Sequence, residues 1–257
     1  MSVIKMPVPS LRDQVSDEEW EQRVNLAACY RLISHFGWDD LIYTHISLRV
    51  WDNKNHFLFN PYGMMFEEIT ASSLIKVDLS GGVIMQSPYG FNPAGFIIHG
   101  AILEARADVD CVLHLHTDQG MAVSAQKQGL LPIVQTSALL QGDISYHDYE
   151  GPATDADERA RLVRDLGDKN LLILRNHGTL AIGKEVADAF LRIHRLERAC
   201  KVQVLAMGGA GDVILPDDRV LERTGKQGRG ESQGDHTDLL WQALLRMLDR
   251  RDRSFRD

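Results

Sequence analysis

The chain has 257 residues, of which 44% are hydrophobic and 25% are charged. These values are ordinary for a globular protein, so we expect one main α/β domain with a sizeable core rather than a disordered chain. The formal net charge of −8 argues against a surface for nucleic acid or for an anionic membrane, because both surfaces need a basic patch. A small molecule or another protein is therefore the expected partner.

Three cysteines, Cys29, Cys111 and Cys200, lie far apart in apolar segments. This pattern predicts reduced core thiols and a cytoplasmic location. Residues 1–13 contain no continuous apolar stretch of the kind found in export signals, and no later run approaches the length of a membrane span. We therefore expect neither an export signal nor a membrane anchor.

The first predicted helix begins after Ser16, whose hydroxyl can cap the first turn while Glu19 reaches back to the cap. An apolar stripe runs along this helix until Gly37 ends it. Alternation of apolar and polar residues then predicts two hairpins, the first with strands over 44–50 and 56–60. Strands over 75–79 and 83–85, joined by a Ser-Gly-Gly turn, form the second hairpin.

Helix caps and changes of hydrophobic period divide the middle of the chain into further elements. In chain order, we expect a helix over 93–106 opened by Asn92 and Pro93, a strand over 110–116, a helix from Thr117 through Ala125, an extended stretch after 129–133, a helix capped by Thr154, a strand over 170–175 and a long helix over 184–207. Strands and helices do not alternate strictly, which predicts a mixed or antiparallel sheet covered by helices rather than a doubly wound parallel sheet.

The C-terminal part differs from the rest in composition. We expect residues 1–209 to form the main domain, and residues 210–257 to form a flexible linker followed by a helical arm. The stretch 223–235 is rich in Gly, Gln and charge, which predicts a mobile loop or linker. The last helix has an apolar stripe that contains Leu240, Trp241, Leu244, Leu245 and Leu248.

Two histidines, His114 and His116, close the strand over 110–116, so the period of two directs both imidazoles to one side of the sheet. Such a pair can bind one divalent cation, with zinc as the first choice and manganese or iron as alternatives. His177 is the best third ligand because it follows another strand and precedes Gly178, which allows a close backbone approach. By itself, an H-x-H pair is more often two polar residues at a sheet edge.

Two other metal-binding folds use a similar pair. The run from His114 to Gln119 comes close to the H-x-H-x-D-H motif of metallo-β-lactamase hydrolases, but Gln119 stands where that motif requires a histidine. Cupins need a glutamate a few residues further on, and Gly120 and Met121 supply none. We therefore set both folds aside.

Seven segments together resemble the class II aldolase and adducin family, over a stretch from about Trp20 to about Gly209. They are LIYTHISLRV (41–50), FLFNPYG (57–63), ITASSLIKVD (69–78), AGFIIH (94–99), HLHT (114–117), YHDY (146–149) and LRNHG (174–178). The chain is more similar to the adducin head domain and its bacterial relatives than to the sugar-phosphate aldolases. The resemblance implies a three-layer α/β/α fold with a mostly antiparallel central sheet, and usually a homotetramer. It also implies that His114, His116 and His177 bind zinc near the subunit boundary.

Several positions depart from the aldolase pattern. The aldolases carry a glutamate that serves as fourth metal ligand and proton shuttle, and this chain has Gly95 in its place. Their phosphate-binding residues correspond to His45, Tyr62-Gly63 and 93–94, which offer few hydrogen-bond donors. The tyrosine that aldolases use near the C-terminus is also missing, because no tyrosine follows Tyr149. A phosphorylated ketose is therefore a poor match. We expect His45, Tyr62 and Gly95 to line the substrate pocket, with capping of strand ends as the alternative role for His45 and Tyr62.

Two residues are candidates for the acid/base group. His99 lies one helical turn after Gly95, and a hydrogen-bonded core histidine is an equal alternative. Tyr146 belongs to the polar cluster 146–149, which we interpret as a surface turn, with an acid/base role as the alternative.

The functional hypothesis is a metal-dependent lyase that cleaves a carbon–carbon bond by aldol-type or decarboxylation chemistry. Its expected substrate is a small non-phosphorylated carbonyl or carboxylate compound. One alternative is a non-catalytic, adducin-like oligomeric interaction module. Another is redox chemistry at iron or manganese in the same triad.

Overall fold

The computed structural model of the protein describes residues 8–85, 87–151, 156–209, 211–229 and 233–257. Its centre is a mixed sheet of seven strands in the order β3-β2-β1-β4-β7-β6-β5. The strands are β1 His45–Arg49, β2 His56–Phe59, β3 Ile75–Asp78, β4 Cys111–Leu115, β5 Ile144–His147, β6 Leu171–Leu174 and β7 Gly178–Gly183. Strands β5 and β6 pair in parallel, and the other neighbours pair antiparallel. The predicted α/β class with a mostly antiparallel sheet is confirmed.

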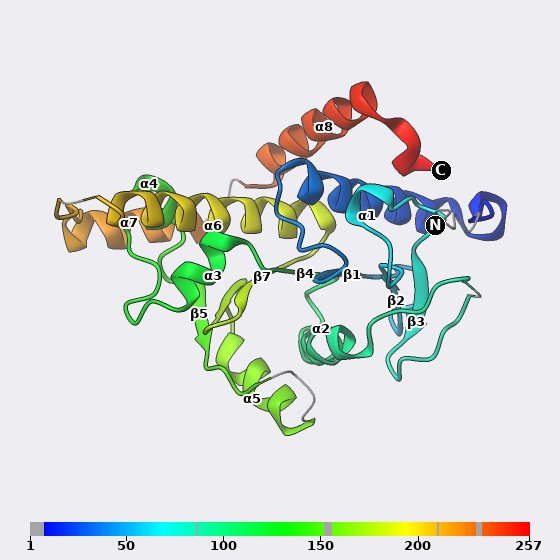
Figure 1. Cartoon of the computed structure of the whole chain (residues 1–257), viewed down its shortest axis with the longest axis horizontal. Helices are drawn as coiled ribbons and strands as arrows, with labels where there is room; N and C mark the ends of the chain where they lie inside the picture. Colours follow the sequence, from blue (N-terminus) through cyan, green and yellow to red (C-terminus); the bar gives the residue numbers. More distant parts are fainter. Residues whose placement is uncertain (1–7, 86, 152–155, 210, 230–232) are drawn as a thin grey trace, which may run out of the picture.

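Helices cover both faces of the sheet (Figure 1). They are α1 Asp17–His35, α2 Pro93–Ala105, α3 Asp118–Ser124, α4 Gln135–Leu139, α5 Ala156–Leu166, α6 Val186–Met207, α7 Asp218–Arg229 and α8 Gln233–Arg251. Helices α1 and α6 lie on one face, α2 and α5 lie on the other, and α8 lies outside α1 and α6. Short 3-10 turns lie at Arg12–Gln14, Phe66–Glu68 and Arg253–Arg256.

Alternation along the central strands separates two hydrophobic clusters, one on each face of the sheet. In β4, Leu113 and Leu115 belong to the cluster under α1 and α6, whereas Val112 belongs to the cluster under α2. His114 follows Val112 at a spacing of two and therefore points to the α2 face. In β1, Ile46 packs on the α1 side, which places His45 on the same face as His114.

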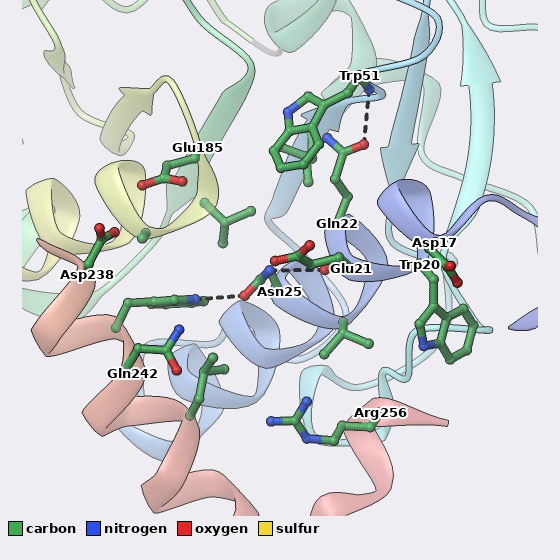
Figure 2. Close-up of a pocket in the computed structure, with 16 residues that line it drawn as sticks. Asp17, Trp20, Glu21, Gln22, Asn25, Trp51, Glu185, Asp238, Gln242 and Arg256 are labelled. Carbon is green, nitrogen blue, oxygen red and sulfur yellow. Dashed lines mark hydrogen bonds between the residues drawn. The ribbon is translucent and has the colours of Figure 1, made fainter. Parts of the chain in front are cut away.

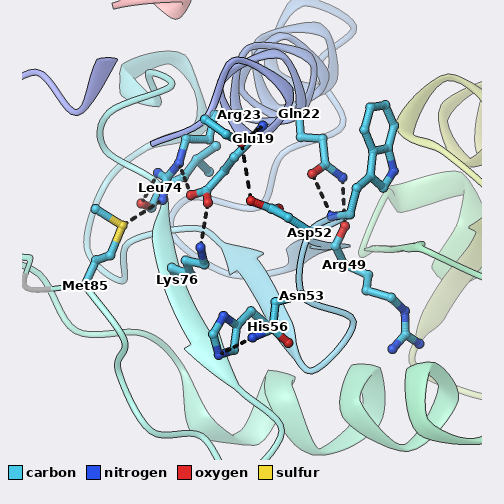
Figure 3. A network of polar contacts seen from close by, with 12 residues as sticks. Glu19, Gln22, Arg23, Arg49, Asp52, Asn53, His56, Leu74, Lys76 and Met85 are labelled. Carbon is cyan, nitrogen blue, oxygen red and sulfur yellow. Dashed lines mark hydrogen bonds and ion pairs between the residues drawn. The ribbon is translucent and has the colours of Figure 1, made fainter. Parts of the chain in front are cut away.

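The start of α1 partly follows the prediction. The Ser16 hydroxyl accepts the Glu19 N–H at 3.1 Å, so the cap is confirmed. The Glu19 side chain does not reach back to the cap, however. It binds Arg23 Nε at 2.9 Å and Lys76 Nζ at 2.5 Å in a buried network (Figure 3). Arg23, which is fully buried, also donates to two main-chain carbonyls of the loop before β3, and thereby joins α1 to the sheet edge.

Several predicted elements differ from the structure. Residues 83–85 form no regular strand, because Val83 makes a single bridge to Val77 and the Asp78 carboxylate closes the turn through the N–H groups of Ser80 and Gly82. The extended stretch expected after residues 129–133 is absent, and helix α4 begins there instead. Strand β7 was not predicted at all. The helix cap expected at Thr154 lies outside the described residues.

The expected linker over 223–235 is wrong for residues 223–229, which lie in α7. Two glycines that suggested flexibility are positions of close packing, since a Cβ at Gly225 would lie 2.8 Å from the Gln141 carbonyl and Gly228 is closer still to Leu139. Trp241, Leu245 and Leu248 of α8 join the core cluster of α1 and α6. The division of the chain at residue 209 stays a prediction.

The cysteines agree with the expectation of reduced core thiols, because Cys29, Cys111 and Cys200 are all buried and free. Burial raises the pKa of the Cys111 and Cys200 thiols, which are therefore protonated and inert in the core. Among the described helices, none combines the length and the apolar composition that a bilayer crossing requires.

Candidate metal centre

Three imidazoles converge at one end of the central strands. His114 lies near the end of β4, His116 follows that strand directly, and His177 lies in the turn between β6 and β7. The Nε2 atom of His116 lies 2.9 Å from the Nε2 atoms of both other rings. One ligand atom from each ring lies within 4.8 Å of the others. The structure thus brings together the three histidines that the sequence singled out.

Hydrogen bonds at the far side of two rings set their tautomers. His114 Nδ1 lies 2.9 Å from the carbonyl oxygen of Thr179, and His116 Nδ1 lies 3.1 Å from Asp40 Oδ2. Since a carbonyl or carboxylate oxygen accepts, each Nδ1 carries the proton and donates it. The lone pair of each Nε2 is therefore directed at the centre of the triad, as in most histidines that bind metals.

Burial keeps two of the three rings, those of His114 and His177, in the neutral form that a metal ligand needs. His114 is 2% exposed, and burial followed by the nearby rings of His116 and His177 holds its pKa well below the usual range. Burial, with a smaller contribution from His116, lowers the pKa of His177 to about 4. Both imidazoles are consequently neutral at physiological pH and available to a cation.

The turn between β6 and β7 depends on two unusual backbone positions. Asn176 has a φ of 54°, a left-handed conformation that asparagine tolerates better than most residues. A Cβ at Gly178 would overlap the carbonyl of Leu115 and lie 3.2 Å from His116 Cδ2. The close backbone approach that the sequence predicted at Gly178 is therefore confirmed, and it brings β7 against β4.

The residues present fit a divalent cation. Nitrogen ligands 2.0–2.1 Å from a tetrahedral zinc ion lie roughly 3.3 Å apart, so the two 2.9 Å separations from His116 need only a small expansion. Three neutral imidazoles suit zinc and the other borderline metals better than they suit magnesium or calcium. A three-ligand set also leaves one coordination position for a substrate.

A second chain of histidines lies on the same face of the sheet. His45 of β1 pairs in register with His114 of β4, and their ring centroids are 5.6 Å apart. His45 Nδ1 lies 2.9 Å from His99 Nε2, and His99 Nδ1 lies 2.8 Å from the Ser47 hydroxyl. Burial, before any neighbouring charge, holds the pKa of His45 and of His99 well below the usual range. Ser47, His99 and His45 thus form a neutral hydrogen-bonded chain that ends beside the triad.

Helix α2 contacts this chain through Gly95. An ideal Cβ at position 95 would fall inside the His45 ring, against both Cδ2 and Nε2. The His45 imidazole therefore occupies the space into which a side chain at position 95 would project. Both residues thus lie in direct contact next to His114, and their expected role in lining the substrate pocket stays a prediction.

The loop that joins α1 to β1 is conformationally strained. Asp40 of this loop accepts the hydrogen bond from His116 Nδ1. Two other residues of the loop, Leu41 and Thr44, have positive φ values of 52° and 63°. Positive φ is costly for a β-branched residue such as Thr44, which is also buried with an unpartnered hydroxyl among the described residues. Strain of this kind gathers at functional sites and is held by the surrounding structure.

The two candidate tyrosines are not in contact with the triad in the described part of the chain. The Tyr62 ring is exposed. Tyr146 lies on β5, so the expected surface turn is wrong at this position. Its hydroxyl accepts the Leu130 N–H at 3.0 Å, and the Arg175 guanidinium lies 4.3 Å from its ring centroid. These contacts give Tyr146 a structural role in holding the 129–130 turn.

A small hollow lies beside His177. Its volume is about 10 Å³, which is room for one water molecule, and Arg175 and His147 are among the residues that line it. The Nδ1 atom of His147 lies 2.8 Å from Asp165 Oδ2, while its Nε2 atom is buried without a hydrogen-bond partner in the described residues. The Arg175 guanidinium itself is held by the Gln126 carbonyl and the Tyr146 ring.

A larger cavity, of about 550 Å³, lies elsewhere (Figure 2). Leu48 and Trp51, near the end of β1, line it together with α1, the start of α6 and α8. Since His45 begins β1, this cavity belongs to the opposite end of the strand from the triad. Despite its larger volume, this cavity is therefore not part of the metal centre.

Sequence reasoning missed the residues that support the triad. Asp40 and Thr179 carry no local motif, because their partners His116 and His114 lie 76 and 65 positions away. Ser47 could have been predicted, because it lies two residues after His45 in β1 and therefore points to the same face of the sheet.

Comparison with known proteins places the fold of this chain among proteins of one family. Residues 24–204 match the model of the family described as "Class II Aldolase and Adducin N-terminal domain". A crystal structure of an aldolase II superfamily protein from Pseudomonas syringae is 47% identical, covers 97% of this chain and 100% of its own, and superposes with a TM-score of 0.93.

Two further similarities lead in different functional directions. L-fuculose 1-phosphate aldolase from Glaciozyma antarctica is 30% identical, with coverage of 97% and 96% and a TM-score of 0.80. Mouse alpha-adducin is 43% identical over 95% of this chain, which spans 35% of the length of that protein.

Proposed function

We propose that this chain, which belongs to the class II aldolase and adducin family, is a metal-dependent carbon–carbon lyase. Its reaction would be aldol-type cleavage or decarboxylation of a small non-phosphorylated carbonyl or carboxylate compound. The observation that supports this proposal most strongly is the convergence of the Nε2 atoms of His114, His116 and His177, with the proton of His114 held on Nδ1 by Thr179.

A divalent cation, most simply zinc, would supply Lewis-acid chemistry by polarising a carbonyl oxygen of the substrate. His114, His116 and His177 would hold that cation and leave one position open. Asp40 and Thr179 orient two of these rings, so their role is to keep the ligand nitrogens aimed at one point.

We assign the acid/base position to His45, with His99 behind it. The family's aldolases have a glutamate at the position of Gly95, and here the His45 ring fills that space. His45 Nδ1 is hydrogen-bonded to His99 Nε2, and His99 Nδ1 to the Ser47 hydroxyl, so this chain orients the His45 ring. A proton taken up at His45 Nε2 makes that ring an imidazolium, whose Nδ1–H donates to His99 Nε2 until the proton passes to the product.

We infer a non-phosphorylated substrate from the side chains that are expected to line the pocket. His45 is already bonded to His99, and the exposed Tyr62 offers a single hydroxyl, so these residues make a weak phosphate cradle. Tyr62 is a weaker pocket candidate than His45 and Gly95, and Tyr146 is a weaker acid/base candidate than His99.

Two further properties belong to the same proposal. The resemblance to the family's enzymes supports a homotetramer, and the reduced core cysteines support a cytoplasmic location. Sedimentation equilibrium of the purified chain and fractionation of cells that express it test these two points.

The experiment that tests the proposed function joins metal analysis to a substrate screen. Protein purified without chelators is expected to contain one divalent ion per chain, identified by elemental analysis as zinc, manganese or iron. The screen uses pyruvate-type aldols and aromatic or keto acids, with L-fuculose 1-phosphate as the phosphorylated comparison. Turnover of the phosphorylated sugar alone would contradict the substrate class, and a metal-free protein would contradict the lyase.

A second candidate is a non-catalytic assembly module, which the similarity to alpha-adducin favours. In that case the ion would be structural or absent, and Gly95 would reflect the loss of a catalytic carboxylate. Stoichiometric metal without turnover of any compound in the screen, in a protein that assembles normally, is the outcome expected for this alternative.

A further inference from the structure

A buried carboxyl group lies on the face of the sheet opposite the triad. Glu197 of α6 is 2% exposed and accepts hydrogen bonds from the hydroxyls of Thr117 and Thr179. Thr179 is adjacent in β7 to Leu180, which packs in the cluster under α2, so the Thr179 side chain points the other way, toward α6.

Both threonines are neighbours of metal-centre histidines in the chain. Thr117 directly follows His116, and its hydroxyl oxygen also accepts the Gly120 N–H at 2.9 Å, which caps α3. Thr179 offers its carbonyl oxygen to His114 Nδ1. One carboxyl on α6 is thus joined to the residue after His116 and to the residue that sets the tautomer of His114.

The surroundings leave little freedom in this arrangement. A Cβ at Gly120 would lie 2.8 Å from Thr117 Oγ1 and 3.1 Å from Glu197 Oε1, so the backbone of α3 packs directly on the carboxyl. Burial raises the pKa of Glu197, and the two threonine hydroxyls oppose that shift. An apolar side chain would fill this part of the core at a lower desolvation cost, so packing alone does not account for a carboxyl here.

We propose that Glu197 is the positioning residue of the metal centre. It ties the end of β4 to the start of β7 from behind the sheet, and thereby holds the Nε2 atoms of His114 and His116 at the spacing that a cation requires. This inference rests on the proposed metal site, but it does not depend on the identity of the substrate.

The test is titration of Co²⁺ and Zn²⁺ into the metal-free full-length chain. Glu197→Gln keeps the shape of the side chain but offers one acceptor oxygen to two hydroxyls. Residues that support metal ligands typically change affinity by 10–100-fold, and we expect a loss in this range together with a shifted visible spectrum of the Co²⁺ form.

Two further variants and one control separate positioning from stability. Thr179→Val removes the hydroxyl but keeps the carbonyl for His114, so it is expected to weaken binding, while Thr179→Ser restores it. Glu19→Gln alters an equally buried carboxyl in the α1 network, and it is expected to lower the melting temperature without changing metal affinity. If Glu197→Gln does not fold, the metal affinities of the two Thr179 variants test the positioning role by themselves.

Wild-type affinity and an unchanged Co²⁺ spectrum in Thr179→Val, or in a folded Glu197→Gln, would overturn the inference and leave Glu197 as a residue of the core. Absence of metal binding in the wild-type chain would instead overturn the proposed metal centre, and this inference with it.

Discussion

The His45 ring fills the space beside the α2 backbone that a side chain at position 95 would occupy. Strand β1 and helix α2 are therefore matched to each other at the metal centre, a large ring on one element against a bare backbone on the other. The relationship explains how a glycine is accommodated near the start of a helix, where it weakens helix formation. It also places an imidazole beside His114, at a ring separation of 5.6 Å.

Gly95→Ala tests this match. The added methyl group would overlap the His45 ring, so we expect a loss of about 1–3 kcal/mol in the free energy of unfolding, even though alanine is the better helix former by about 1 kcal/mol. Urea denaturation measures the change. Gly90→Ala is the control, because no atom lies within 4 Å of its added Cβ. Equal stability of Gly95→Ala and the wild type would refute the steric match.

The buried network of Arg23, Glu19 and Lys76 is expected to stabilise the fold independently of the metal centre (Figure 3). Arg23→Leu removes one of the two cationic partners of a carboxylate that is 2% exposed and leaves Lys76, so we expect a loss of up to about 3–5 kcal/mol, the cost of breaking a buried pair. The control is Lys226→Met, which breaks an exposed ion pair and is expected to leave the free energy of unfolding almost unchanged. Chemical denaturation should show the large effect in the first variant only. A loss of bound metal in a folded Arg23→Leu protein would contradict the independence of the two sites.

The lowered pKa of His194 predicts that the protein loses stability in mild acid. Burial first, and then Arg198 and Arg195, lower its pKa below the usual 6.5. As the pH falls below 6.5, the unfolded chain therefore takes up a proton before the folded chain does, and the free energy of unfolding decreases until the folded-state pKa is passed. We expect His194→Gln to lose less stability than the wild type between pH 7.5 and 5, measured by denaturation at matched metal content. Parallel pH profiles for the two proteins would show that His194 does not contribute.

Much of the fold could be predicted because its signals are local. Ser16 marks the start of α1 and Gly37 its end, and alternation in β1 and β4 assigned their faces correctly. Strand β7 was missed because its six residues are bounded by Gly178 and Gly183 and buried on both faces, so they show no alternation. Helix α7 was missed because glycines that pack closely on α4 have the same composition as glycines in a linker.

In the metal centre too, local features could be predicted from the sequence and long-range contacts could not. His114 and His116 share a strand, so their common direction follows from spacing alone, and Gly178 pointed to the approach of His177. The supporting contacts from Asp40, Thr179 and Glu197 join segments far apart in the chain, and spacing carries no information about them. Tyr146 was misjudged because an edge strand with half-buried residues resembles a polar turn in sequence.

The central claim is that the triad holds one cation, and metal content measured on purified variants tests it most directly. We expect one equivalent of divalent metal in the wild type and in His236→Ala, whose side chain is exposed on α8, and a severe loss in His114→Ala and His177→Ala. Full metal content in a folded His114→Ala protein would contradict the assignment.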